Sequence, residues 1–345
     1  MLTRTIHFTG KITTLEPLTV TLKDSASASG HRLPRNGGYS SGPYFPGTTI
    51  RGVLRHAAHR VVVERVAAEN GGVIPFDLAD HFMLAQGVDI VNQAETIRMG
   101  EINAGERIRS ANPLLSLFGR WGLMGKAGIG NATPTGEEQW AMFGGGARTI
   151  MFERDESLID LLGPDQVERL ERIISEQAEA SIDIQSIKSE QAALRALLKT
   201  MNKEAAQELR TKIRELDEQI KARKEKKSEA YESIRRPLDS YEAFIAGAEL
   251  SHRMVIKNAT DTEAGLFIAA LIRFAAHPRL GGHSGHNCGL VEATWQATTW
   301  KPGELTPTRL GDISLTQDGV KITGQEIEKM LETFRENKDL NFKVC

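Results

Sequence analysis

Residues 43–66, PYFPGTTIRGVLRHAAHRVVVERV, predict a tight turn that leads directly into an amphipathic helix. Pro46 fixes φ and cannot donate a hydrogen bond, and Gly47 supplies the conformational freedom of a sharp turn. We expect Thr48 or Thr49 to cap the helix by accepting its first unpaired amide protons. The apolar residues behind this cap recur at helical spacing and form one buried stripe: Ile50, Val53, Leu54, Ala57, Ala58, Val61 and Val62.

The start of this helix has the features of an anion site. Free amides and a partial positive charge lie at the first turn of any capped helix. Arg51 and Arg55 lie on the first turns and off the apolar stripe, so they favour a phosphate backbone over a small carboxylate as the ligand. An ordinary amphipathic helix with solvated arginines is the alternative interpretation of this stretch.

The composition is typical of a soluble globular protein with a sizeable core. The chain has 345 residues, of which 40% are apolar and 26% charged, so it forms two domains or one large domain with an insertion. The net charge of −2 gives no overall basic excess. However, residues 1–63 hold eight basic residues against two acidic ones, which predicts a local basic face.

Cysteine content and hydropathy favour a cytoplasmic protein without a membrane partner. The two cysteines, Cys288 and Cys345, do not suggest a disulfide framework and favour a reducing compartment. The N-terminal sequence MLTRTIHFTG lacks the layout of a signal peptide. No apolar run approaches the ~20 residues that a membrane span needs.

The first 150 residues predict strands on both sides of the opening helix. Residues 3–22 alternate between apolar and polar, which indicates a long bent strand or a hairpin broken near Pro17. Residues 24–44 are rich in Ser, Gly and Pro and predict a flexible loop that carries Arg32 and Arg35. We expect a weak helix over 74–92 and a polar, irregular connection over 92–110. A short helix over 113–118 should end at Gly119. Residues 121–150 predict strands with a flexible hairpin near Arg148 and Arg154.

Residues 165–235 differ sharply in composition from the rest of the chain. They are dominated by Glu, Lys, Arg, Gln, Ala and Leu, and they contain heptad spacing at Leu209, Ile213, Leu216 and Ile220. We expect an antiparallel helical (coiled-coil) hairpin that reverses at 200–203. Its nearly balanced charges favour a solvated structural insertion over an RNA-binding arm, and both interpretations stay open.

Globular sequence resumes at Pro237. The pattern predicts a strand over 241–257, a buried helix over 264–276, a strand over 290–296, a hairpin over 311–323 and a surface helix over 324–337. Between the buried helix and its following strand lies a loop with four glycines in nine residues, 281–289. It matches neither GxGxxG nor the P-loop, so we expect no nucleotide cofactor.

This loop suits a nucleic-acid backbone, which is contacted by amides and small polar groups. The predicted contacts are Gly281, Gly282, His283, Ser284, His286 and Asn287. The histidines and Cys288 do not have the spacing of a zinc site, so we expect no metal. Asp24 is the acidic residue in the loop before the first helix. It could assist RNA cleavage, although an aspartate in a loop is usually a turn residue.

The segments FPGTTIRGVLR, NPLLSLFG, EAFIAGAEL and LGGHSGHNCG resemble, in this order, the RAMP superfamily of CRISPR–Cas proteins. Within it the chain is most similar to the Cas-seven-type backbone subunit of type IV effectors. The resemblance implies an α+β fold: a modified RRM-like, ferredoxin-like palm with a βαββαβ sheet, and a thumb hairpin that starts near 141–154. The implied domains are 1–150 with 236–304 as the core, 165–235 as the helical insertion, and 305–345 as a C-terminal hairpin and helix.

The resemblance also implies the function of a backbone subunit that oligomerises along a CRISPR RNA without cutting. On this hypothesis, Thr48, Thr49, Arg51 and Arg55 hold RNA phosphates at the first helix, Arg32 and Arg35 close over the same RNA strand, and Arg148 and Arg154 lie on the thumb. The implied partners are this RNA, further copies of the chain, Cas-five-type and large or Cas-eight-like subunits, a guide-processing endonuclease, a target DNA strand and a DinG-like helicase. Strand one lacks the RRM stacking aromatics apart from Phe8, so stacking of bases on the sheet is not expected. The alternatives are a type III-like ribonuclease that uses Asp24 and a coiled-coil scaffold without RNA binding.

Overall fold

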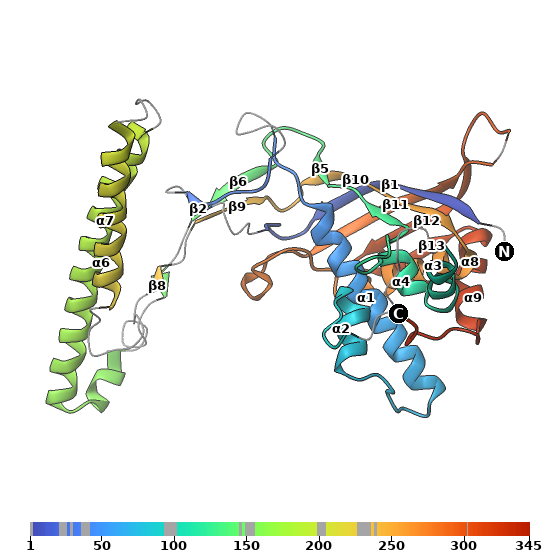
Figure 1. Cartoon of the computed structure of the whole chain (residues 1–345), viewed down its shortest axis with the longest axis horizontal. Coiled ribbons are helices and arrows are strands. Elements are labelled where there is room, and N and C mark those ends of the chain that lie inside the picture. Colours follow the sequence, from blue (N-terminus) through green and yellow to red (C-terminus); the bar gives the residue numbers. More distant parts are fainter. Residues whose placement is uncertain are drawn as a thin grey trace. The chain divides into compact units, whose positions relative to one another are not determined.

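The computed structural model describes residues 3–20, 26–27, 30–35, 42–92, 102–144, 147–148, 156–198, 205–225, 236–237, 240–301 and 303–345. The chain divides into two compact units, residues 1–144 with 240–345 (unit 1) and residues 145–239 (unit 2). Both consist of helices and mainly antiparallel strands (Figure 1), so the fold is α+β. Residues 305–345 belong to unit 1, where strands β12 (Thr308–Thr316) and β13 (Gly319–Thr323) extend the main sheet.

The strands are short in the middle of the chain and long at its two ends. Their bounds are β1 Arg4–Thr14, β2 Ala26–Ser27, β3 Gly30–His31, β4 Ala127–Ile129, β5 Thr133–Pro134, β6 Trp140–Phe143, β7 Ala147–Arg148, β8 Arg236–Pro237, β9 Tyr241–Phe244, β10 Glu249–Ala259, β11 Val291–Thr299, β12 Thr308–Thr316 and β13 Gly319–Thr323. The helices are α1 Gly47–Glu69, α2 Leu78–Gln86, α3 Ile102–Ala111, α4 Pro113–Phe118, α6 Pro164–Leu198, α7 Ala205–Glu225, α8 Asp261–Ala275 and α9 Gln325–Glu336, with 3₁₀ turns at Glu156–Leu161 and Ser284–His286.

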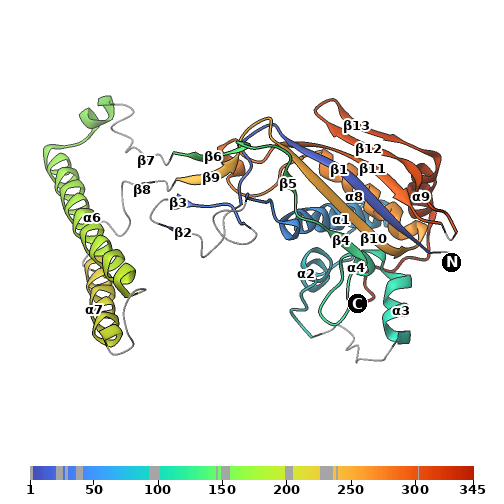
Figure 2. The ribbon, with the colours of Figure 1, turned by 90° about the horizontal axis from the view of Figure 1, so that it is seen from above.

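The main sheet of unit 1 has the strand order β13-β12-β11-β1-β10-β4, and β5 also pairs with β10. All of these pairings are antiparallel, and β1 lies between β10 and β11. Along the chain, the elements around this centre follow each other as β1-α1-β4-β10-α8-β11. Figure 2 shows α1 and α8 together on one side of the sheet.

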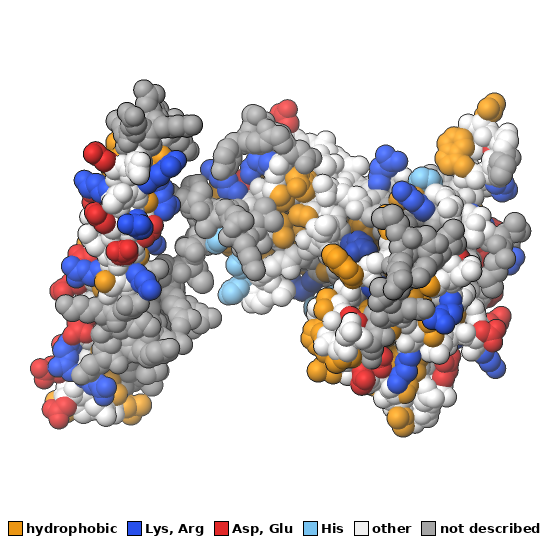
Figure 3. Space-filling view, in the orientation of Figure 1, with side chains coloured by type: hydrophobic (Ala, Val, Ile, Leu, Met, Phe, Trp, Pro, Cys, Tyr) orange, Lys and Arg blue, Asp and Glu red, His pale blue; other side chains and the backbone are white. Residues whose placement is uncertain are grey.

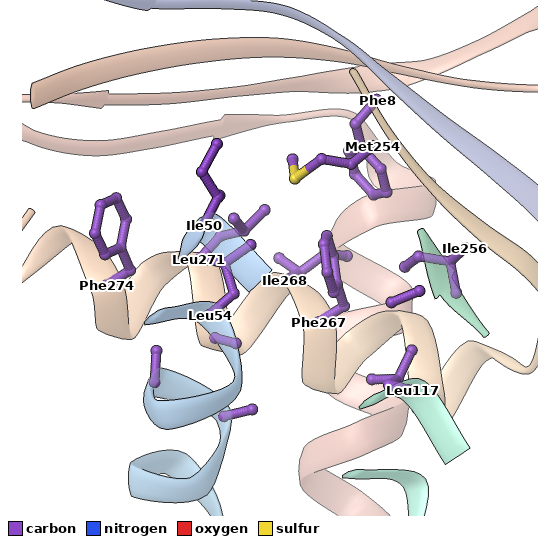
Figure 4. Packing of buried hydrophobic residues seen from close by; sticks show 14 of the residues in the cluster. Phe8, Ile50, Leu54, Leu117, Met254, Ile256, Phe267, Ile268, Leu271 and Phe274 are labelled. Carbon is purple, nitrogen blue, oxygen red and sulfur yellow. The ribbon is translucent and has the colours of Figure 1, made fainter. Parts of the chain in front are cut away.

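The core lies between this sheet and its helices. The alternation predicted for β1 is confirmed, because Ile6, Phe8 and Ile12 are buried while Thr9 and Lys11 on the other face are exposed. Figure 4 shows the side chains that meet below the strands, and they come from β1, β10, α1, α4 and α8: Phe8, Ile50, Leu54, Leu117, Met254, Ile256, Phe267, Ile268, Leu271 and Phe274.

Helix α3 differs from the sequence prediction, and helix α9 agrees with it. Residues 102–111 form α3 rather than an irregular connection, because tertiary contacts hold this otherwise polar segment. Its Ile108 is fully buried, and Arg109 donates to the backbone carbonyls of Ser116 at 3.2 Å and Met124 at 2.7 Å. Helix α9 is the predicted surface helix: one face packs on α8 through Ile327, Met330, Leu331 and Phe334, and the other face is exposed.

Unit 2 contains α6 and α7, which pack against each other with opposite chain directions. Gln191 donates to Asp217 at 2.6 Å, and Arg223 pairs with Asp183 at 3.1 Å. Leu216 and Ile220 of the heptad pattern are buried. Figure 3 shows acidic and basic side chains interspersed over these helices, which is typical of a solvated surface.

Candidate nucleic-acid interface

Helix α1 begins two or three residues earlier than predicted, and no threonine caps it. Pro46 is the N-cap residue in an extended conformation (φ −65°, ψ 128°), and the first amide, that of Gly47, donates to Oδ1 of Asn131 at 2.9 Å. A Cβ on Gly47 would lie 2.4 Å from the carbonyl oxygen of Ile129, so only glycine fits there. The threonine cap was therefore wrong, because a side chain from a distant loop takes that role. Thr48 is exposed and Thr49 half-buried on the first turn.

Arg51 lies half-buried beside the short helix α4. Its Nη2 donates to the carbonyl oxygen of Phe118, and its guanidinium lies 6.0 Å from the centre of the Phe118 ring. Burial lowers the pKa of Arg51 below its ordinary value. No carboxylate pairs with it among the described residues. Arg51 therefore presents a cation next to the first turn of α1, where Thr48 is exposed.

Arg55, one turn further on, is only 6% exposed and has a different environment. Its Nε donates to the carbonyl of Leu84 at 2.8 Å, Nη2 to that of Met83 at 2.8 Å, and Nη1 to those of Gly119 at 2.9 Å and Phe118 at 3.3 Å. Burial and the neighbouring Arg51 lower its pKa to about 10. The guanidinium thus binds the carbonyl-rich ends of α2 and α4. This geometry does not fit the predicted phosphate contact of Arg55.

The glycine-rich loop lies against the chain segment that leads into α1. The amide of Gly282 donates to the carbonyl of Thr19 at 3.0 Å. A Cβ on Gly281 would come within 2.1 Å of that carbonyl and 3.3 Å of the Phe45 ring, so the loop approaches this segment closely. Phe45 immediately precedes the Pro46 N-cap. The structure therefore brings together the first turn of α1 and the loop, two elements that are about 235 residues apart in the chain.

Most of the loop's predicted contacts face solvent. Gly281, His283, Ser284, His286 and Asn287 are exposed and Gly282 is half-buried. His283 and Asn287 adopt positive φ angles of 59° and 54° at the two ends of the 3₁₀ turn.

A stack of rings supports this loop, and sequence reasoning missed it. His283 stacks on Tyr241 of β9 with ring centres 4.8 Å apart, and Tyr241 stacks on Phe143 of β6 at 5.6 Å. The hydroxyl of Tyr241 lies 3.5 Å from Sγ of the buried Cys288. This contact, together with burial, raises the pKa of Tyr241 to about 12. The only sequence signal was the alternation of β6 and β9, which placed these rings on strands but not beside the loop.

The predicted basic residues of the early loop lie in different settings. Arg35 forms a bidentate ion pair with the buried carboxylate of Glu242, and both side chains are almost fully enclosed. An RNA contact by Arg35 does not fit this pairing. Arg32 is half-buried on the same segment. The backbone of Arg148 pairs with Arg236 between β7 and β8 in unit 2, while Asp24 and Arg154 lie outside the described residues.

A further basic groove lies on the sheet face opposite the helices. It encloses about 770 Å³ and is lined by His7 of β1, Arg253 and Lys257 of β10, and Asn131 beside the start of α1. Arg253 and Lys257 are exposed, and none of the described residues that line the groove is acidic. Alternation along 249–259 could have indicated these outward cations. Phe8 does not contribute to this face, since it is buried on the opposite one.

The remaining histidines do not form a metal site in the part of the chain that the structure describes. No group of three or more His, Cys, Asp or Glu side chains is suitably placed there to hold an ion. His59 and His81 approach each other, with Nε2 and Nδ1 3.0 Å apart, and burial lowers the pKa of His59 to about 4. Among the described helices, none is both long and apolar enough to cross a membrane.

Comparison with known proteins finds structural neighbours and no relative by sequence. No protein-family model matches the sequence, and no curated protein matches it. One of these neighbours is a chain of a Type IV-B CRISPR Complex. The similarity covers 88% of the present chain and 95% of the neighbour, with 15% sequence identity and a TM-score of 0.41. A similarity at this level leaves the function to be argued from the residues themselves.

Proposed function

We propose that this chain is a CRISPR-RNA-binding backbone subunit of a type IV effector, and that several copies assemble along one guide. The observation that carries the proposal is the contact of the glycine-rich loop with the segment before α1, through Gly281, Thr19 and Phe45. It brings the first turn of α1, where Thr48 is exposed, near a run of exposed polar groups in the loop. Such groups bind phosphates and sugars without reading bases, which suits a guide whose bases must stay free to pair.

The order of the elements supports the proposed palm. In β1-α1-β4-β10-α8-β11, the strands lie in the order β11-β1-β10-β4. A βαββαβ unit with the fourth strand beside the first and the second at the far edge is the ferredoxin-like arrangement. The outward side chains of β1 are polar rather than aromatic, in agreement with binding through the backbone of the RNA.

The insertion supports the proposed thumb and helical hairpin. The chain leaves unit 1 after β6 and returns at β9, and these two strands pair with each other, as do β7 and β8 beyond them. In this proposal the strands belong to a thumb that carries Arg148 and Arg154, and α6 and α7 form an antiparallel hairpin that serves as a solvated structural insertion.

We further propose that the subunit is not a nuclease and acts in the cytoplasm with the other effector subunits. Metal-dependent cleavage of a guide-matched RNA that is lost in Asp24→Asn would contradict the first part and favour the ribonuclease alternative. A chain that lacks residues 165–235 should still bind RNA. The scaffold alternative would be favoured if neither the full chain nor the chain without residues 165–235 binds RNA, and if the deletion abolishes binding of a protein partner.

The decisive experiment is co-expression with a CRISPR array, followed by extraction and sequencing of the bound nucleic acid. We expect CRISPR RNA in ladder-like assemblies. Arg51→Ala should weaken binding and reduce the slope of log K against log salt by about 0.7, the value of one phosphate contact on a single strand. Arg60→Ala, an exposed arginine further along α1, is the matched control and should leave the slope unchanged. A monomer free of nucleic acid would overturn the proposal.

A further inference from the structure

We propose that a hollow beside α1, which we call the Trp121 pocket, binds one nucleotide of single-stranded RNA. The pocket is lined by Arg51, Arg55, Phe118 and the turn Gly119–Gly125, and it encloses about 620 Å³. The base would stack on the indole of Trp121, and the phosphate would face Arg51. This inference rests on the proposed function and adds a base-binding position to it, where the other predicted contacts involve only phosphates.

The turn that carries Trp121 is held in place at both ends. The amide of Arg120 donates to the carbonyl of Leu123 at 3.0 Å, and the reverse bond is 2.9 Å long. Gly122 takes the positive φ of 79° that this two-residue turn requires. Beyond the turn, Arg109 holds the carbonyl of Met124 at 2.7 Å. Trp121 is therefore presented by a fixed backbone, and little order has to be gained on binding.

The apolar side chains of this turn face solvent. Trp121 is 93% exposed and Met124 is 85% exposed, although both are large. No ring of the described residues stacks on the indole. An exposed indole on a fixed turn gains free energy when a flat apolar surface covers it, and every nucleobase offers such a face.

The charge of the pocket selects an anion. Three arginines line it, Arg51, Arg55 and Arg120, and no acidic side chain is found among the described residues of its lining. Burial lowers the pKa of both Arg51 and Arg55, and neither pairs with a carboxylate of the described residues. Within the described part of the chain, their hydrogen bonds go to backbone carbonyls, so a bound phosphate would be attracted strongly.

The combination favours a nucleotide over a peptide. A nucleotide unit carries a planar base and a phosphate only one sugar apart, which matches an indole and a cation in one hollow. The volume lies within the range of pockets that hold small ligands, about 300–1,000 Å³. Because Arg51 is close to the first turn of α1, a strand bound there would continue directly into the pocket.

The test uses the full chain and a 5′-labelled, unstructured 20-nucleotide RNA, with the Kd measured by fluorescence anisotropy at several salt concentrations. Trp121→Ala should raise the Kd roughly 5- to 150-fold, the value of one stacked base. The slope of log K against log salt should not change, because the indole is uncharged. Trp121→Phe should recover most of the affinity. Trp300→Ala, which removes another exposed tryptophan immediately after β11, is the matched control and should bind as the wild type does.

Each of the other outcomes overturns the inference. Wild-type affinity in Trp121→Ala would refute the pocket and leave the proposed function intact. An equal loss in Trp300→Ala would show that the effect is not specific to the pocket. Normal RNA binding with lost self-assembly in Trp121→Ala would identify the turn as a protein contact. Absence of RNA binding in the wild-type chain would refute the proposed function and the pocket together.

Discussion

Replacement of Arg55 by alanine should destabilise unit 1 rather than remove a phosphate contact. The guanidinium donates to the carbonyls of Met83 and Leu84 in the last turn of α2, and to those of Phe118 and Gly119 at the end of α4. Arg55→Ala leaves these acceptors without their cationic donor. The two helix ends also lose a positive charge at their negative poles.

The magnitude follows from the three shortest bonds, which measure 2.8 to 2.9 Å. A hydrogen bond to a charged group contributes about 1.5–3 kcal/mol, and an unsatisfied buried acceptor costs about 1–3 kcal/mol. The carbonyl of Met83 keeps a second donor, the amide of Gly87 at 2.9 Å, and water can reach Gly119 through the Trp121 pocket. Leu84 therefore bears most of the cost, and we expect a loss of about 3 kcal/mol in the free energy of unfolding.

The measurement is urea unfolding at 25 °C followed by tryptophan fluorescence. All four tryptophans lie in unit 1, so the signal reports this unit and not the helices α6 and α7. Arg51→Ala, which loses one bond to Phe118, should cost only about 1 kcal/mol. Arg55→Lys should be nearly as unstable as Arg55→Ala, because one ammonium cannot reach carbonyls on both helices. A stability for Arg55→Ala within about 0.5 kcal/mol of the wild type would refute this reasoning.

Two further predictions concern the start of α1 and the interior of the sheet. Gly47→Ala should lower the free energy of unfolding, measured in urea, by about 1–3 kcal/mol, because the new Cβ meets the carbonyl of Ile129. Gly52→Ala is the control: its Cβ would lie in open space, so the change should be neutral or slightly stabilising. Equal effects of the two substitutions would contradict the close packing at Gly47. The pKa of buried His252 is lowered to about 4, so the unfolded chain binds more protons between pH 6.5 and 4, and acid removes stability. Between pH 7 and pH 5, this residue should account for about 2 kcal/mol of the decrease in the free energy of unfolding. His252→Gln should therefore show a smaller pH dependence of stability, and an unchanged pH dependence in this variant would contradict the assignment.

Periodicity predicted those parts of the fold whose burial follows from local pattern. The alternation in β1 and the stripe from Ile50 to Val62 correctly identified the buried faces, because each element presents a single side to the core. The same reasoning could not find α3, where one buried residue and an arginine that binds distant carbonyls stabilise a polar helix.

The candidate site was harder to predict because its chemistry depends on contacts between distant segments. Arg51 and Arg55 are equivalent in the sequence pattern, yet the ends of α2 and α4 enclose only the second. Asn131 replaces the expected threonine cap from 84 residues away. Trp121 lies between turn residues without periodicity, so no local signal distinguishes it from a core tryptophan such as Trp295.

The central position of β1 has a consequence for folding during synthesis. Both neighbours of this strand come much later in the chain: Lys11 pairs with Ser251, about 240 residues further on, and with Thr294 on its other side. At a translation rate of about 5–20 residues per second, β1 leaves the ribosome about 12–50 s before β10 can reach it. During that time an apolar strand with two unpaired edges is exposed to self-association. We therefore expect the yield of soluble protein to depend strongly on chaperone capacity and expression temperature.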